Sequence, residues 1–578
     1  MIAQAMDEPV NRLDMVMRYH QETKHHFNHY AKALGSLDWA NQPNPFRRYE
    51  GADLIRLPIL RLDDEPLSPS YDHMYHPGAV PSVPVTLRAL SRLFEYALAL
   101  SAWKQAGSSR WALRSNPSSG NLHPTEGYLL IGAITGLASS PGLYHYAPKE
   151  HGLERRADCP DALFTAMMQA FPPHAFLIGL SSVHWREAWK YGERAFRYCQ
   201  HDVGHAIGTV RIAAATLGWT AVALTGASDA TVEYVLGLNR VEDFDGAERE
   251  HPDVVMVVYP TEHANDWRAG AERVLPLCLD PDLACELATP SHHVWHGKAN
   301  RLSPDAPTPW EIIDHVAAAS RKLTNELHGL SLPLTPTLPL PPQEAGQSAG
   351  QLIHQRRSLL ACDGKTSLSA ECFYAMLARV MPRVDLDVLR RPMPWDAIPW
   401  DPTIHLGVFV HRVDGIPPGL YVLARDPAKV NQLRTAMHGQ FAWSAPPGCP
   451  ADLPLYLLEE GNAQRIATQV SCFQDIAGAG AFSLGMIAEY QAALLTHGPW
   501  FYRRLFWETG LIGQVLYLEA EAAGVRATGI GCFFDDPVHN VFGLKAVAFQ
   551  SLYHFTVGGP VDDPRLTTLP PYGPPSSD

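Results

Sequence analysis

The strongest constraint on the fold of this chain is an internal repeat with an offset of 306 residues. Gly204 matches Gly510 at this offset, and Gly237 matches Gly543, with no gap between them. The same offset pairs three further positions: Arg197 with Arg503, Gly218 with Gly524, and Asp229 with Asp535. Two alanine-rich helices can look alike by chance, but a gapless match through a helix, a strand and a second helix indicates duplication. A chain of 578 residues is long enough to form two cores.

Both copies show the same order of predicted elements. A long amphipathic helix ends at a glycine, a short strand follows, an aspartate caps a second helix, and a last strand closes the unit. Earlier hairpin-like pieces also correspond, such as PGLYHYA and PGLYVLA. Helices and strands mix without regular βαβ alternation. This pattern predicts two α+β sandwiches and not a doubly wound sheet.

A proline-rich segment separates the two copies. The sequence SLPLTPTLPLPPQEAGQSAGQ at residues 331–351 is typical of a stiff spacer with a flexible end. We therefore predict a first domain at residues 1–321, a linker at 322–352 and a second domain at 353–578.

Composition excludes several classes of partner. The net charge of −14 makes the chain a poor binder of nucleic acid or of anionic membranes. No apolar run reaches the length of about 18 residues that a membrane helix needs, and the N-terminus lacks a signal-peptide pattern. The nine cysteines are scattered, and no C-x-x-C pair occurs, so we expect a cytoplasmic protein without a metal site.

The first candidate binding segment is a polar turn between a predicted helix at residues 87–104 and a predicted strand at 127–133. It consists of Pro117, Ser118, Ser119, Gly120 and Asn121. Its hydroxyl, amide and bare backbone groups suit a planar heterocycle with polar edges. By itself the composition is also that of an ordinary turn.

Cationic and glycine-rich segments of the second half form the next candidates. Arg356, Arg357 and Ser358 suit a phosphate, because guanidinium groups match its oxygens, although such a triplet is often a solvated patch. Arg565, just after the last strand, is a candidate second phosphate ligand. The segment Gly529-Ile530-Gly531 ends a strand where the backbone can approach a ligand face, or where the strand simply bends.

Lys190 and Tyr191 precede the long helix of the first half. They are candidate proton-transfer groups if burial or a bound cofactor shifts their pKa values. The alternative is a surface lysine beside an amphipathic tyrosine.

Together these motifs resemble the nitroreductase-like flavoproteins, and within them the SagB-type (thiazole/oxazole) dehydrogenase branch. The matching segments are YHQETK at 19–24, LDWANQP at 37–43, NPSSGNLHPTE at 116–126, KYGERAFRY at 190–198, DVGH at 202–205 and PRLTTLPPY at 564–572. The resemblance covers most of the chain except residues 267–351. It implies an FMN held at the interface of two such folds. One fold supplies the R-R-S loop, the glycine strand and C-terminal basic residues, and the other supplies the P-S-x-x-N-type loop.

The two halves of this chain divide those parts between them. R-R-S occurs only in the second half and P-S-S-G-N only in the first, where the second half has MPWDAIPWDP. Gly529 and Gly531 align with Ala223 and Thr225. The resemblance therefore implies an intrachain pseudo-dimer with one complete FMN site and one lost site.

The resemblance also implies a function. The chain is expected to be an FMN-dependent oxidoreductase that oxidises azoline-like rings on peptides, with Lys190 or Tyr191 taking a proton. The alternatives are an NAD(P)H-dependent reductase of nitro compounds or quinones, and a flavin-sequestering protein that is not an enzyme. The expected partner is a small-molecule or peptide substrate, and the branch also allows a biosynthetic complex. The sequence leaves open the substrate, the redox partner and the direction of the reaction.

Overall fold

The computed structural model describes residues 9–262, 274–289, 294–326, 329–330, 346–382 and 391–573. Within these ranges the first half contains a seven-stranded antiparallel sheet in the order β2-β7-β6-β5-β8-β10-β9. Its strands are β2 (Leu54–Arg56), β5 (Thr125–Ile131), β6 (Gly142–Ala147), β7 (Gly152–Asp158), β8 (Phe176–Ser182), β9 (Trp219–Ala223) and β10 (His251–Pro260).

The second half repeats this sheet. Its order is β18-β17-β15-β19-β21-β20, which matches the first sheet from β7 to β9. The strands are β15 (Ile404–Val410), β17 (Gly419–Leu423), β18 (Leu455–Glu460), β19 (Phe482–Ala488), β20 (Arg526–Ile530) and β21 (Gln550–Gly558). The predicted α+β class and the duplication are confirmed.

Three helices of each half, like β8 and β19, keep the offset of 306 residues at both ends. They are α4 (His184–Tyr191) with α15 (Tyr490–His497), α5 (Ala195–Thr216) with α16 (Phe501–Ala522), and α6 (Asp229–Leu236) with α17 (Asp535–Phe542). Gly218 and Gly524, which follow α5 and α16, have left-handed φ angles of 68° and 72°, as the helix-stop pattern predicts. Gly237 and Gly543 end α6 and α17 in the same conformation.

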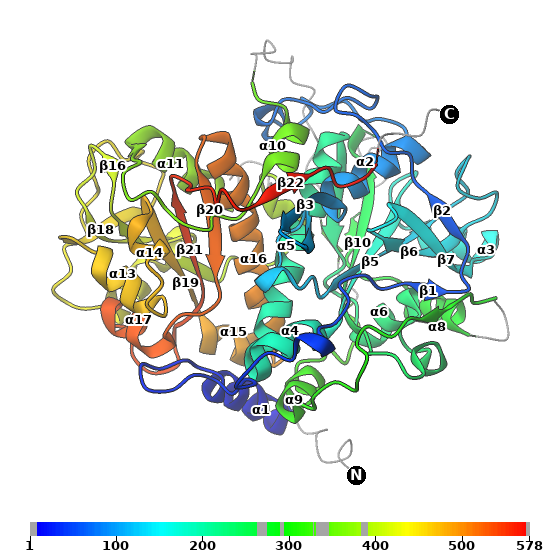
Figure 1. Ribbon diagram of the computed structural model, residues 1–578, viewed down its shortest axis with the longest axis horizontal. Coiled ribbons are helices and arrows are strands. Elements are labelled where there is room, and N and C mark those ends of the chain that lie inside the picture. Colours follow the sequence, from blue (N-terminus) through cyan, green and yellow to red (C-terminus); the bar gives the residue numbers. More distant parts are fainter. Residues whose placement is uncertain are drawn as a thin grey trace.

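Helices α5 and α16 lie side by side at the centre of the molecule, between the two sheets (Figure 1). Every residue of α5 is buried, so this helix is covered on all sides. The helices approach most closely where equivalent glycines meet. A Cβ atom on Gly204 would overlap the carbonyl of Trp507, and one on Gly510 would overlap that of His201.

Equivalent ion pairs connect the two halves. Arg197 Nη1 lies 2.9 Å from Asp535 Oδ1, and Arg503 Nη2 lies 2.6 Å from Asp229 Oδ1. Each arginine is 306 residues from the other, as is each aspartate. The contact between the halves is therefore a pseudo-two-fold one, in which the same surface serves on both sides.

Both ends of the chain pack on the opposite half. From helix α1 (Pro9–Glu22), the His20 side chain lies 3.2 Å from Gln550 Oε1. Strand β22 (Thr567–Leu569) pairs antiparallel with β3 (Leu100–Ala106) of the first half (Figure 1). The largest buried hydrophobic cluster accordingly contains side chains from both halves, whereas each half also has a separate cluster of its own.

The structure bears on two sequence-based expectations, the helix at 87–104 and the linker at 322–352. The helix predicted at 87–104 is α2 (Leu87–Ala97), and the chain then forms β3 because β4 (Ser109–Arg114) and β22 pair with it. At the predicted linker, residues 331–345 lie outside the described residues. Near its start, the Asn325 side chain accepts a hydrogen bond from the Ser228 backbone, and α10 (Ala349–Gln355) begins before its predicted end. The domain bounds themselves stay a prediction.

None of the helices in the described ranges is long and apolar enough to cross a membrane.

Candidate functional site

The polar turn of the first half is fixed to helix α5 by a buried carboxylate. The Ser119 backbone N–H and the Ser119 hydroxyl both donate to Asp202 Oδ1, each at 3.0 Å. The Asn121 amide donates to the carbonyl of Ala112 at 2.8 Å. Gly120 adopts a left-handed φ of 57°, and a Cβ atom there would collide with the Tyr191 hydroxyl. The turn therefore lies directly beside the end of α4.

Lys190 and Tyr191 occupy that end of α4. Lys190 Nζ lies 5.2 Å from the centroid of the Tyr191 ring. The Tyr191 ring in turn lies 4.5 Å from the ring of Tyr198 on α5. The structure thus brings the predicted proton-transfer pair next to the predicted polar turn.

The glycine segment of the second half reaches the same tyrosines. The Gly529 backbone N–H donates to the Tyr517 hydroxyl at 3.2 Å. A Cβ atom at Gly529 would overlap Tyr553, and one at Gly531 would overlap the ring of Tyr198. The Ile530 side chain instead packs in the hydrophobic cluster of the second half, so only its backbone can face this region.

The R-R-S segment runs beside β20. Ser358 forms a parallel bridge with Ala527, and its hydroxyl lies 3.1 Å from that of Tyr517. Arg356 Nη2 donates to the carbonyl of Arg114 in the first half at 2.9 Å. Segments from both halves therefore lie close together. We call the group formed by residues 117–121, Lys190, Tyr191, Tyr198, Asp202, 356–358, Tyr517, 529–531 and Tyr553 the composite site.

One edge of the composite site is strongly cationic. Burial, followed by the repulsion of Arg356, lowers the pKa of Arg357 to about 10. Burial and the charges of Arg357 and Arg526 also lower the pKa of Lys104. Within the described part of the chain, the buried Arg356 Nε has no hydrogen-bond partner. Clustered and incompletely paired cations of this kind favour a bound anion.

Arg565 does not join this cationic edge. Its side chain is 84% exposed, and its guanidinium pairs with Asp563, which lies two residues earlier. The prediction of Arg565 as a phosphate ligand therefore has no support in the structure. Lys104 and Arg526 lie near Arg357 instead, although Arg526 pairs with Asp562 at 2.7 Å. The position of Lys104 depends on strand pairing that the sequence does not reveal.

The pseudo-symmetric counterpart of the composite site is filled by side chains. Arg504, the counterpart of Tyr198, donates to the carbonyl of Thr225, the counterpart of Gly531. Its guanidinium carbon lies 5.3 Å from the Trp400 ring and 4.2 Å from the Trp500 ring. At Gly531 the corresponding space is taken by the uncharged Tyr198 ring instead of a guanidinium group.

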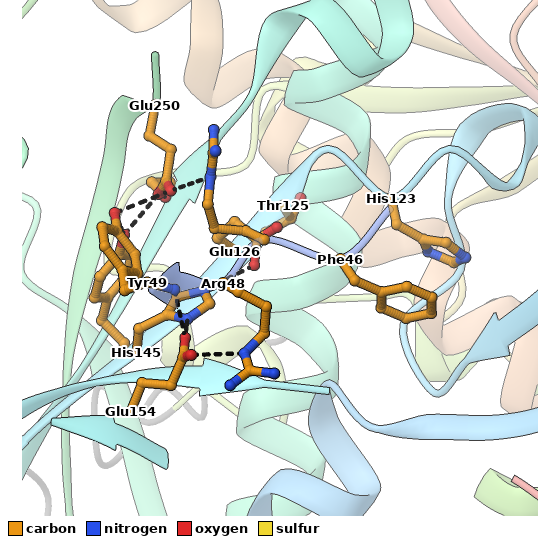
Figure 2. Close-up of polar contacts among 12 residues, drawn as sticks. Phe46, Arg48, Tyr49, His123, Thr125, Glu126, His145, Glu154 and Glu250 are labelled. Carbon is orange, nitrogen blue, oxygen red and sulfur yellow. Dashed lines mark hydrogen bonds and ion pairs between the residues drawn. The ribbon is translucent and has the colours of Figure 1, made fainter. Parts of the chain in front are cut away.

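A second polar cluster lies in the sheet of the first half, and Figure 2 shows its contacts. His145 lies between Glu126 and Glu154, with nitrogen–oxygen distances of 3.0 and 2.9 Å. Arg48 Nε contacts Glu154 at 2.6 Å, and Arg186 pairs with Glu126. Because these buried charges are matched by opposite charges, the cluster is suited to holding the sheet together.

The sequence pattern missed several members of the composite site. The missed residues lie on the central helices or on a buried strand: Tyr198, Asp202, Tyr517 and Tyr553. Aromatic residues in such elements look like ordinary core residues. The repeat carried a usable signal, because the offset of 306 residues aligns Tyr198 with Arg504 and Tyr517 with Arg211. Among the described residues, no group of three or more His, Cys, Asp or Glu side chains is placed to hold a metal ion.

Comparisons with known proteins fit this architecture. No protein-family model matches the chain. A curated relative from Methanocaldococcus jannaschii, named "Putative nitroreductase MJ1384", is 26% identical over 159 residues, which are 27% of this chain and 76% of that protein. The crystal structure of a "putative nitroreductase" from Anabaena variabilis has a TM-score of 0.64 at 21% identity, covering 95% of this chain and 99% of that chain.

The E. coli microcin synthetase McbBCD complex with truncated pro-MccB17 bound is also similar, at 16% identity. The match covers 39% of this chain and 78% of that chain. Its TM-score of 0.27 is too low to carry an argument. Nearly the whole chain therefore has a nitroreductase-like α+β fold, whereas its chemistry has to be argued from the site.

Proposed function

We propose that the protein is an FMN-dependent oxidoreductase that holds one FMN in the composite site. The observation that supports this most is the complementary division of parts between the halves. From the second half, Arg356 donates to the carbonyl of Arg114, just before the polar turn, and Gly531 lies against Tyr198 of the first half. In the equivalent position, Arg504 and two tryptophans fill the space.

The residues present fit the chemistry of FMN. Arg356, Arg357 and Lys104 would hold the phosphate, since they lie at the cationic edge, where Arg526 is already paired with Asp562. Gly529 and Gly531 present bare backbone next to Tyr553 and Tyr198, whose side chains occupy the Cβ positions of the two glycines. The turn at 117–121 would meet the polar edges of the ring. Bound FMN would supply two-electron chemistry, while the chain supplies position and proton transfer.

Lys190 and Tyr191 are the proposed proton-transfer groups. Burial, followed by the nearby carboxyl of Glu187, raises the pKa of Tyr191 well above its usual value, so its hydroxyl stays protonated at neutral pH. The second half has Thr496 and His497 at the equivalent positions. The pair therefore belongs to the one composite site and not to the fold that both halves share.

For the substrate we propose an azoline-like ring on a peptide, which the oxidation converts to an azole. This step rests on the resemblance to SagB-type dehydrogenases and on the Lys-Tyr pair. Reduction of nitro compounds or quinones with NAD(P)H is the alternative reaction, and flavin sequestration is the non-enzymatic one. Rapid bleaching of the bound flavin by NADH would favour the reductase. A flavin that no reductant or substrate changes would favour sequestration.

The function is tested with Lys190→Ala and Tyr191→Phe. Both variants should retain FMN and turn over an azoline peptide about 10²- to 10⁴-fold more slowly, the range for loss of a positioned proton-transfer group. Flavin absorbance measures retention, and mass spectrometry of the peptide follows the loss of two hydrogens. Full activity in both variants would contradict the proposed role. Loss of flavin in both would indicate that the pair is structural.

A further inference from the structure

A buried carboxyl group lies beside the proposed proton-transfer pair. Glu187 is on α4, one helical turn before Lys190 and Tyr191, and its side chain is fully buried. Within the described residues, neither carboxyl oxygen of Glu187 has a hydrogen bond of normal geometry. A buried carboxylate in this state is costly, so the group favours its protonated form.

A second acid lies close to Glu187. Asp202 on α5 interacts with it electrostatically, and the Ser118 side chain lies within range of both acids. Burial, followed by the negative charge of Asp202, raises the pKa of Glu187 well above its usual range, although Lys190 opposes the shift. Burial also raises the pKa of Asp202 to about 7, against its hydrogen bonds from Ser118 and Ser119. The pair therefore holds at least one proton at neutral pH.

The fold itself does not require an acid at this position. The counterpart of Glu187 in the second half is Ala493, on the equivalent helix α15. The counterpart of Asp202 is Glu508, whose carboxylate accepts hydrogen bonds from Thr403 and so fixes the equivalent loop in the second half. An acid at the Asp202 position thus has a structural role in both halves. An acid at the Glu187 position occurs only in the half that carries Lys190 and Tyr191.

We propose that Glu187 is the proton reservoir of the composite site and exchanges one proton with Lys190 or Tyr191 in each turnover. This inference rests on the proposed function. A hydride transfer between substrate and flavin leaves one proton to be given up or taken up. When a substrate is reduced, the O–H bond of Glu187 breaks and its proton passes through the pair to the substrate. When a substrate is oxidised, the proton it gives up passes the other way, and an O–H bond forms on whichever of the two acids, Glu187 or Asp202, is then without a proton. No electrons are exchanged at Glu187, which acts through the two residues of the pair.

The test uses the FMN-loaded full-length protein and needs no natural substrate. Light in the presence of EDTA reduces the flavin, and infrared difference spectra record protonated carboxyl groups that change with reduction. The variants are Glu187→Gln, which keeps the shape of the side chain, and the matched control Asp253→Asn. Asp253 is also buried with its pKa raised to about 7 by burial, but its carboxylate accepts a hydrogen bond from Ser182 at 2.6 Å.

We expect a carboxyl band that changes on reduction in the wild type and in Asp253→Asn, that shifts in D2O, and that is absent in Glu187→Gln. The same variant should take up protons on reduction about 10²-fold or more slowly while keeping its FMN. A band that persists in Glu187→Gln, or that is missing in the wild type, would contradict the proposed role of Glu187 as a proton reservoir.

Two further outcomes separate the inference from the function on which it rests. If Glu187→Gln does not fold, Glu187→Asp keeps an acid there and should move the band, and an unmoved band would overturn the inference. If the wild-type chain binds no FMN, the proposed function fails and the reservoir fails with it. A chain that binds FMN but gives no carboxyl signal overturns the reservoir alone.

Discussion

At the level of single residues, the composite site is defined by differences between two otherwise equivalent halves. Tyr198 corresponds to Arg504, and Gly531 corresponds to Thr225. The glycine leaves its Cβ position to the Tyr198 ring, whereas the threonine carbonyl accepts a hydrogen bond from the arginine. A few substitutions thus place an aromatic ring beside bare backbone in one position and a guanidinium group in the other.

Arg356 provides a residue-level prediction. Arg356→Ala should weaken FMN binding by about 1.5–3 kcal/mol, the usual value of a hydrogen bond to a charged group. Titration of the apoprotein with FMN, followed by fluorescence quenching, measures the change. The exposed Arg565→Ala is the matched control and should bind FMN as the wild type does. Equal affinities for the wild type and Arg356→Ala would mean that the phosphate lies elsewhere.

His145 provides a second residue-level prediction, on stability. Burial alone would lower its pKa, but hydrogen bonds to Glu126 and Glu154 outweigh burial and raise the pKa to about 9. The imidazolium therefore stabilises the fold fully below the unfolded pKa of about 6.5, and this contribution disappears as the pH rises through 9. Urea denaturation of the wild type and His145→Gln at pH 6 to 10 measures it. The difference in unfolding free energy between them should shrink with rising pH, and a constant difference would contradict the assignment.

At the level of secondary-structure elements, the central helices α5 and α16 create the site. They carry the acid that fixes the polar turn and two of the tyrosines, Tyr198 and Tyr517. Their close contact at Gly204 and Gly510 brings the two sheets near enough for both halves to reach the same tyrosines. The crossing ion pairs reinforce that contact. Burial alone would raise the pKa of Asp535, but Arg194 and Arg197 outweigh it and hold the pKa far below its usual value.

The helix contact predicts the effect of Gly510→Ala. The added Cβ would meet the backbone carbonyl of His201, which cannot move aside as a flexible side chain could. Overpacking costs about 1–3 kcal/mol, and because the added atom meets rigid backbone we expect this cost to exceed the gain of about 1 kcal/mol from alanine in a helix. We expect lower thermal stability and weaker FMN retention. The control is Gly439→Ala, where nothing lies within 4 Å of the new atom. Unchanged melting of Gly510→Ala would show that the helices can separate without cost.

At the level of the whole molecule, the two halves form one interlocked unit. The N-terminal segment packs on the second half, and β22 completes a sheet of the first. The largest hydrophobic cluster is shared between the halves. Because the composite site draws on both halves, its geometry depends on this shared core.

The molecule-level prediction is a stoichiometry of one FMN per chain. Only one of the two pseudo-equivalent positions combines a cationic edge, a bare strand and a polar turn in the described part of the chain. Flavin absorbance after acid release, divided by protein concentration from amino-acid analysis, gives the ratio. Two FMN per chain would contradict the composite site, as would FAD in place of FMN.

The sequence by itself determined the duplication and the α+β class, and it predicted most segments of the composite site. These depend on local pattern: the gapless offset of 306 residues, the glycines that end helices, and short motifs such as P-S-S-G-N and R-R-S. It also determined that the parts are complementary, because the loss of a motif is visible in an alignment of the two halves. Beyond this the sequence misled at residues 98–106, where pairing with β22, far away in the chain, forms β3 instead of extending the helix.

Only the tertiary structure decided which side chains meet. Tyr198, Tyr517 and Tyr553 look like core residues in the sequence, and they become part of the site because α5 crosses α16 at two glycines. Arg565 looks like a phosphate ligand but points to solvent and pairs with Asp563. Glu187 is an ordinary acidic residue of a helix until burial beside Asp202 changes its protonation. Pairing, burial and electrostatic coupling depend on distances between segments hundreds of residues apart, and local sequence patterns do not carry those distances.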